Sequence, residues 1–77
     1  MPNNIGFLYF EKKEYDKAIT YYTLAIHYYP LYFNAYRNRA DAKNAIGDIA
    51  GACEDVKKAK ELGDAKSAKF YAEYCLK

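Results

Sequence analysis

The chain has 77 residues, enough for one small domain, and 52% of them are hydrophobic while 29% are charged. This composition is typical of a folded protein and excludes a disordered chain. The net charge of only +2 gives a weak electrostatic footprint and disfavours phosphate-backbone binding, and no apolar run reaches the roughly 18–20 residues that a membrane span needs.

Apolar residues recur at steps of three and four along the chain, which predicts helices rather than strands. The longest such stripe lies in "EYDKAITYYTLAI". In chain order, the pattern predicts five helices, at about 3–13, 16–29, 33–46, 49–62 and 65–76. Because the connections are only two to four residues long, consecutive helices are expected to lie antiparallel as neighbours.

Proline and glycine mark the predicted breaks. Pro30 cannot continue a helix and biases Tyr29 out of the helical region. The pairs Gly47-Asp48 and Gly63-Asp64 each combine a residue suited to the left-handed end of a helix with one whose side chain caps the next helix. These pairs predict tight helix–turn–helix connections.

An internal repeat appears when the chain is shifted by 34 residues. Small residues then align with small ones and large apolar residues with large ones. Helices cross closely only where side chains are small, so the small sites indicate close backbone approach. The aligned pairs are Gly6 with Ala40, Ala18 with Ala52, Tyr22 with Val56 and Ala25 with Ala59.

This period and these residues resemble the tetratricopeptide repeat family, whose unit is a 34-residue helical hairpin. The two copies are "NIGFLYFEKKEYDKAITYYTLAIHYYP" and "AYRNRADAKNAIGDIAGACEDVKKAKELG", with Asp64 where the family closes on proline. The resemblance implies an all-α, right-handed solenoid of αα-hairpins forming one domain over residues 1–77. Repeat 1 is expected at about 1–32, repeat 2 at about 33–64 and a C-terminal capping helix at about 65–77.

In this family the first helix of each repeat lines a concave groove. The resemblance therefore implies a partner-binding groove, to which asparagine amides and an arginine would offer hydrogen bonds. A solvated polar face is the alternative. Only Asn38 matches the carboxylate clamp of chaperone-binding relatives, so that activity is not expected. The groove residues are Asn3, Phe7, Phe10, Asn34, Arg37, Asn38, Asp41, Asn44 and Tyr71, with Asn4, Glu11, Ala45, Ala68 and Ala72 beside them.

Six aromatic rings fall in "YYTLAIHYYPLYF", residues 21–33. We expect most of them in the core or at the corner between hairpins, with a protein contact as the alternative. Base stacking is disfavoured because residues 18–36 contain no lysine or arginine.

Cys53 and Cys75 form no CxxC motif, and the single histidine leaves too few ligands for zinc. They are expected to be packed thiols in a reducing cytoplasm, although a disulfide is the alternative. No pattern suggests a catalytic residue, a metal site or a cofactor, so the chain is not expected to be an enzyme.

The expected function is a protein–protein interaction scaffold that binds a peptide or partner helix, with no nucleic-acid or membrane partner. Two repeats and one helix are fewer than the three repeats usually needed for stability. The alternatives are therefore a fragment of a longer array or a self-associating homo-oligomer, with an RNA-binding repeat less favoured.

Overall fold

The computed structural model describes residues 2–76, and every regular element in that range is helical. Positions 1 and 77, at the ends of the expected repeat units, lie outside the described residues. The observed helix ends lie within two residues of the predicted ones, provided that α5 and the π-helical segment after it are taken together as the fifth predicted helix. The elements are α1 (Pro2–Glu11), α2 (Tyr15–Tyr28), α3 (Phe33–Ala45), α4 (Ile49–Glu61), α5 (Ala65–Phe70) and a π-helical segment, η1 (Tyr71–Cys75).

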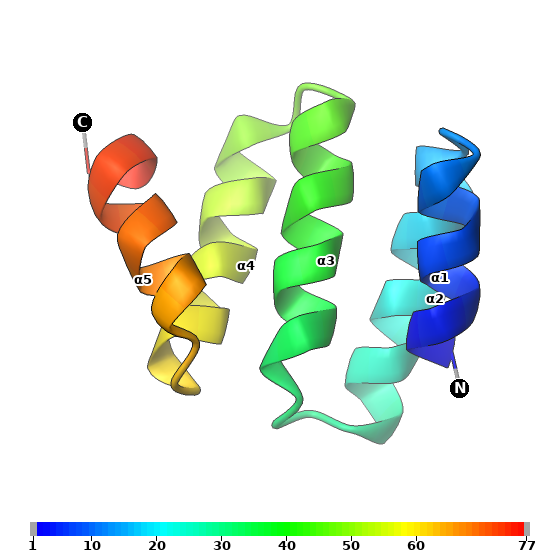
Figure 1. Cartoon of the computed structure of the whole chain (residues 1–77), viewed down its shortest axis with the longest axis horizontal. Coiled ribbons are helices and arrows are strands. Elements are labelled where there is room, and N and C mark those ends of the chain that lie inside the picture. The colour runs from blue at the N-terminus through cyan, green and yellow to red at the C-terminus, as the bar shows by residue number, and fades with distance from the viewer. Residues whose placement is uncertain (1, 77) are drawn as a thin grey trace.

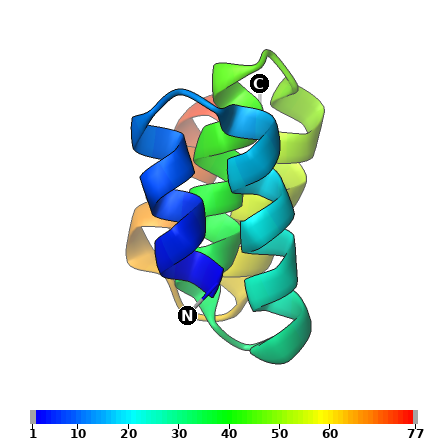
Figure 2. The same ribbon diagram turned by 90° about the vertical axis from the view of Figure 1, so that its right-hand side faces the viewer.

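Each helix packs on the next one in the chain, and their directions alternate, so that α1–α2 and α3–α4 are antiparallel hairpins (Figure 1). In this view α1 lies in front of α2 and α5 lies in front of α4, with α3 between the two pairs. Figure 2 shows the first hairpin from the side, with the second behind it. The predicted all-α helical-repeat fold is confirmed, as a slab of 31 × 25 × 15 Å.

Small side chains occupy the places where helices approach most closely. The predicted alanines of both copies are at most 3% exposed, and Gly6 is buried as well. A Cβ atom on Gly6 would lie 2.7 Å from two ring atoms of Tyr22 and 3.2 Å from the carbonyl oxygen of Ala18. Because Tyr22 is itself only 1% exposed, its ring has little room to move.

A buried ion pair joins α3 to α4. Asp55 lies on the buried face of α4, where Arg39 donates to its two carboxylate oxygens at 2.8 and 2.6 Å and Lys43 Nζ lies 3.1 Å away. The sequence analysis did not single out this pair. The available signal was an acidic residue between Ala52 and Val56 on an apolar face, since buried carboxylates are almost always paired.

The aromatic segment 21–33 divides between core and surface. Tyr22 is buried and Tyr21 stacks on Tyr9 with ring centroids 5.5 Å apart, whereas Tyr28 is 63% exposed and Tyr29 is 46% exposed. Tyr21 and Tyr22 therefore pack against other side chains, as expected. Tyr28 and Tyr29, at the corner between the hairpins, keep much of their surface in water.

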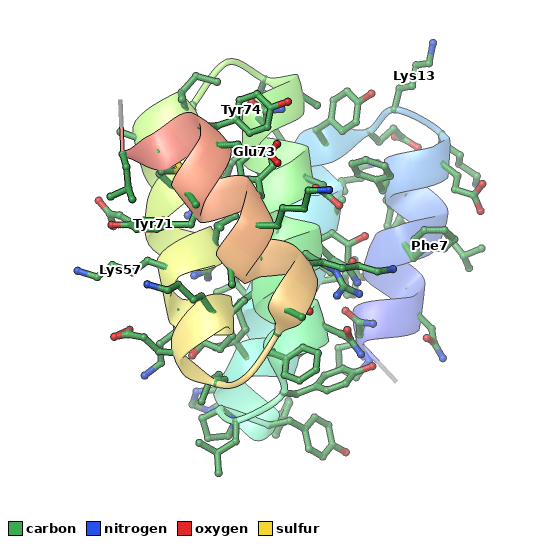
Figure 3. The ribbon with its side chains drawn as sticks, turned by 60° about the vertical axis from the view of Figure 1, so that its left-hand side comes forward. Phe7, Lys13, Lys57, Tyr71, Glu73 and Tyr74 are labelled. Carbon is green, nitrogen blue, oxygen red and sulfur yellow. A yellow bond between two sulfur atoms is a disulfide. The ribbon has the colours of Figure 1, made fainter. Side chains whose placement is uncertain are left out.

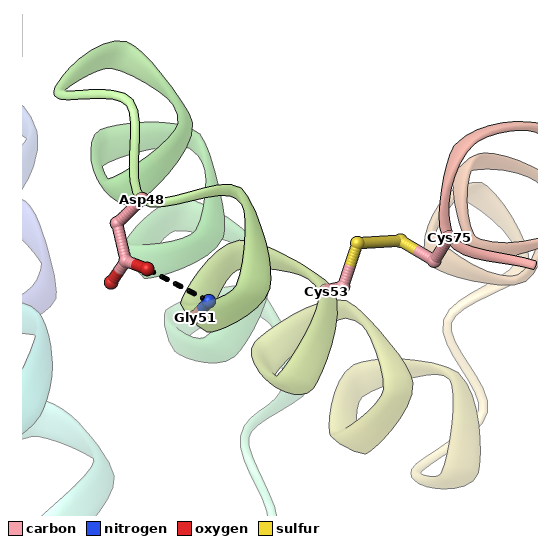
Figure 4. Close-up of a disulfide and its surroundings, with 4 residues drawn as sticks. All are labelled: Asp48, Gly51, Cys53 and Cys75. Carbon is pink, nitrogen blue, oxygen red and sulfur yellow. Dashed lines mark hydrogen bonds between the residues drawn. A yellow bond between two sulfur atoms is a disulfide. The ribbon is translucent and has the colours of Figure 1, made fainter. Parts of the chain in front are cut away.

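The glycines of the turns have the predicted backbone conformation, and one of the two aspartates makes the predicted cap. Gly47 and Gly63 have the expected positive φ angles, 87° and 105°, and Asp48 Oδ1 caps α4 by accepting from the Gly51 amide at 3.0 Å (Figure 4). In the first hairpin the same position, 34 residues before Gly47, holds Lys13, whose φ is 63°. A side chain in this region costs roughly 1–2 kcal/mol relative to glycine.

Replacing Gly6 with valine should lower the free energy of unfolding by about 1–3 kcal/mol, because the added atoms meet the buried Tyr22 ring. Thermal unfolding followed by circular dichroism measures the change. Asn4→Val, on the exposed side of the same helix, controls for the helix propensity of valine. Equal stability of the two variants would contradict the close-approach interpretation.

Replacing Lys13 with glycine should instead raise the free energy of unfolding, by about 1 kcal/mol, because glycine accepts the left-handed conformation without a Cβ clash. Urea unfolding of both proteins checks this. Lys12→Gly, one residue earlier and without a positive φ, should give no gain, and a gain there of the same size would remove the conformational explanation.

Candidate partner-binding groove

Most of the residues predicted to line a groove lie on α3, which stands between the pair α1 and α2 and the pair α4 and α5 (Figure 1). The structure places the predicted α3 residues on this helix at steps of three and four, so they share one face. Their side chains have different roles, because several of them are already engaged within the chain.

Arg37 is held by an internal network. Its Nη1 donates to both carboxylate oxygens of Asp64 at 3.0 Å, and its Nη2 donates to Asn34 Oδ1 at 2.8 Å. Ser67 Oγ also donates to Asp64, at 2.5 Å. The guanidinium that was expected to receive a ligand carboxylate is therefore paired with the turn between α4 and α5.

Asp64 was predicted to cap α5. Its side chain makes no capping hydrogen bond of regular geometry, although the backbone amide of Lys66, in the first turn of α5, contributes to lowering its pKa. The carboxylate is instead 5% exposed and bound to Arg37 and Ser67. Burial alone would raise the pKa of Asp64, but the hydrogen bond from Ser67 and the charge and hydrogen bonds of Arg37 outweigh it and hold the pKa below its usual value.

Asn38 is also engaged, because its Nδ2 donates to Asn3 Oδ1 of α1 at 3.1 Å. This bond connects the two hairpins on the groove side. It brings together one predicted residue from each repeat, and it uses the amide of Asn38 that had been expected to meet a peptide backbone.

Asp41 and Asn44 are the exposed polar groups of the α3 face. The carboxyl of Asp41 is partly desolvated, which raises its pKa, although Arg37 opposes the shift. Burial, and to a smaller extent the negative charge of Asp41, raise the pKa of Tyr22 to about 12. The charge of Asp41 therefore favours the protonated form of this buried hydroxyl group.

Two hollows share Asn44 and Phe70 in their linings: the smaller lies mainly between α3 and α5, and the larger mainly between α4 and the C-terminal helical stretch. One has a volume of about 50 Å³ and the other about 550 Å³. The larger volume is within the usual range of ligand pockets. The smaller is lined by Arg37, Ala40, Asp41, Asn44, Val56, Lys66, Ser67 and Phe70, and the larger by Asn44, Ile49, Ala52, Cys53, Phe70 and Tyr74.

The structure separates the predicted aromatic groove residues. Phe7 is 48% exposed on α1, Phe10 packs edge-on against Tyr15 with ring centroids 5.5 Å apart, and Tyr71 packs against the second hairpin beneath Lys60. Figure 3 shows Phe7 and Tyr71 on opposite sides of the molecule.

Phe70 and Tyr74, rather than Tyr71, line the hollow beside α3. Neither Phe70 nor Tyr74 was predicted from the sequence as a groove residue, and the same is true of Ile49 and Lys66. Phe70 lies one position before the predicted Tyr71, so a shift of one residue in the assumed face of the last helix accounts for the difference. One residue turns a helix by about 100°, enough to exchange a groove position for a packed one.

The cysteines are joined in a disulfide with their Cα atoms 5.7 Å apart (Figure 4), so the expectation of two packed thiols is wrong. The bond connects α4 to the end of η1. The spacing of 22 residues gave no sign of this, because it is the return of the last helix onto α4 that brings the two residues together.

Within residues 2–76 there is no group of three or more histidine, cysteine, aspartate or glutamate side chains placed to hold a metal ion. In the same range, no helix is both long and apolar enough to cross a membrane.

The fold defines an all-α helical-repeat protein. A family model described as tetratricopeptide repeat matches residues 3–30, which cover α1, α2 and the chain as far as Pro30. The resemblance to this family that the sequence suggested is thereby confirmed on the first hairpin. No curated protein and no solved structure matches the chain.

The stability that Asp64 contributes should depend on acid pH. Its pKa is lower in the folded state than its unfolded value of about 3.9, so the contribution is present above that pH and is lost as the pH falls through the folded pKa. Asp64→Asn should lower the free energy of unfolding by about 1.5–3 kcal/mol at pH 7. The deficit should shrink below about pH 4.

Urea unfolding between neutral and acid pH measures this difference. Asp48→Asn is the matched control, because asparagine caps a helix about as well as aspartate does. A deficit of Asp64→Asn that stays constant down to the lowest pH would contradict a role for the ionised carboxylate.

Proposed function

We propose that the chain is a non-enzymatic protein-binding module that holds a peptide or a partner helix in the groove along α3. Tetratricopeptide repeats are protein-interaction modules in general, and the match on the first hairpin supports that class of function here. We propose further that the chain binds its partner in this groove and that it has no catalytic activity. A cytoplasmic location was expected because both cysteines were expected to be free thiols. Since they form a disulfide, no compartment is proposed.

One observation carries the proposal: the exposed amide of Asn44 borders both hollows beside Phe70. An amide offers one acceptor and two donor hydrogens, which suits the backbone of a bound peptide. Phe70, Ile49 and Tyr74 provide an apolar surface next to it for a side chain of the ligand. Pockets of this kind bind through apolar contacts and use a few polar groups to fix orientation.

The paired state of Arg37 and Asn38 narrows the class of ligand. The charge of Arg37 is already paired with Asp64, and although Lys66 borders the smaller hollow, the residues that line the larger hollow include no lysine or arginine to hold a ligand carboxylate. Asp41 is exposed and acidic. The groove is therefore proposed to take a segment with an apolar anchor rather than an acidic tail.

A second candidate is self-association, in which another copy covers the outer face of the first hairpin. That face carries exposed apolar side chains, and Leu8 is 61% exposed where its counterpart Ala42, 34 residues later, is fully buried between hairpins. The exposed side chains are Ile5, Leu8, Leu24 and Tyr28. RNA binding is disfavoured by the absence of lysine and arginine from residues 18–36.

Selection of a random-peptide library on the full chain tests the groove. Peptides that bind the wild-type protein should lose at least about tenfold in affinity to Asn44→Arg, equivalent to about 1.4 kcal/mol, because the larger charged side chain fills the border of the hollows. Isothermal titration calorimetry gives the dissociation constants.

Lys57→Ala is the control, because Lys57 is exposed on α4, on the side away from Phe7 (Figure 3), and should leave affinity unchanged. Light scattering at the working concentration records whether copies of the chain associate. Equal binding of the selected peptides to Asn44→Arg and to the wild type would exclude the groove as their site.

A further inference from the structure

The disulfide lies at the edge of the candidate groove. Cys53 of α4 is one of the residues that line the larger hollow, and so is Tyr74 of η1, the residue before Cys75. The bond therefore fixes the distance between α4 and the segment that carries the aromatic wall (Figure 4).

The segment η1 is attached to the second hairpin at its first residue, Tyr71, which packs against the core beneath Lys60. None of the residues of η1 is buried, Tyr74 near its end is 62% exposed, and Leu76, which follows η1, is 67% exposed. Tyr74 contacts Phe70 with ring centroids 4.8 Å apart, but this contact lies within the same helical stretch and does not bind η1 to the rest of the fold. Segments with few buried contacts open locally at low free energy.

By contrast, α5 is held independently of the disulfide. Its Ser67 is 1% exposed and bonds to Asp64, which Arg37 ties to α3, and Phe70 packs against the core of the second hairpin. Because Tyr71 also packs against this core, loss of the disulfide would affect the part of η1 after Tyr71 rather than α5.

We propose that the Cys53–Cys75 disulfide is a redox-sensitive latch that keeps Tyr74 in place as a wall of the groove. A dithiol reductant supplies two electrons and two protons, the sulfur–sulfur bond breaks, Cys53 and Cys75 become thiols, and the reductant forms its own disulfide. Both cysteines are partly exposed, so a thiolate can reach the bond. Reduction then releases η1, Tyr74 leaves the wall, and the hollow opens to water.

The regulatory consequence rests on the proposed function, since it acts on the same groove, but the release of η1 can be measured without any ligand. Amide hydrogen exchange followed by NMR on the full chain, with and without dithiothreitol, is the experiment. We expect the protected amides among residues 73–76 to exchange at least tenfold faster after reduction, while those of Ala40 and Ala42 in α3 keep their rates.

A Cys53→Ser/Cys75→Ser double variant should show the fast exchange of residues 73–76 at once and should not respond to dithiothreitol. Unchanged exchange of residues 73–76 in the reduced wild type would overturn the latch. Loss of protection at Ala40 and Ala42 would also overturn it, because the disulfide would then hold the whole domain. Failure of every peptide to bind would count against the proposed groove function and would leave the exchange result standing.

Discussion

The close approach of helix backbones at small residues is the constraint on which the rest of this structure depends. Gly6 leaves no space for a Cβ atom beneath the Tyr22 ring, and fully buried alanines occupy the other contacts between helices. A chain this short buries its apolar surface inefficiently, so it gains from dispersion contacts only if its helices are very near one another. These contacts set the order and spacing of the helices.

Two of the polar residues of α3 make hydrogen bonds that stabilise the fold, and their side chains are therefore less available to a ligand. Arg37 and Asn38 look similar in sequence to binding residues, yet each joins its helix to a distant part of the chain, the first to Asp64 and the second to Asn3. A charged or amide group that already makes hydrogen bonds within the chain is a weak candidate for recognition. The exposed Asn44 beside Phe70 combines a free surface with an apolar neighbour, which is why the proposed site moves towards the C-terminal helix.

Most of the fold could be predicted from the sequence, because the signals for it are local or periodic. Apolar steps of three and four, the glycines at 47 and 63 and the 34-residue shift gave the helices and turns nearly to the residue. The site was less predictable, because side-chain pairing depends on contacts between distant parts of the chain: Arg37 meets Asp64 across 27 positions and Cys53 meets Cys75 across 22. The π-helical end of the last helix, which carries Tyr74, had no local signal either.

The disulfide has a mechanical consequence. When the chain is pulled from its two ends, the tension passes from Cys53 to Cys75 through the sulfur–sulfur bond, and the intervening end of α4, α5 and η1 carry none of it. The stretched length of the oxidised chain is therefore shorter by about 70 Å, the extended span of the bypassed segment. Since α5 lies inside that loop, it is shielded from force that would peel the first hairpin away.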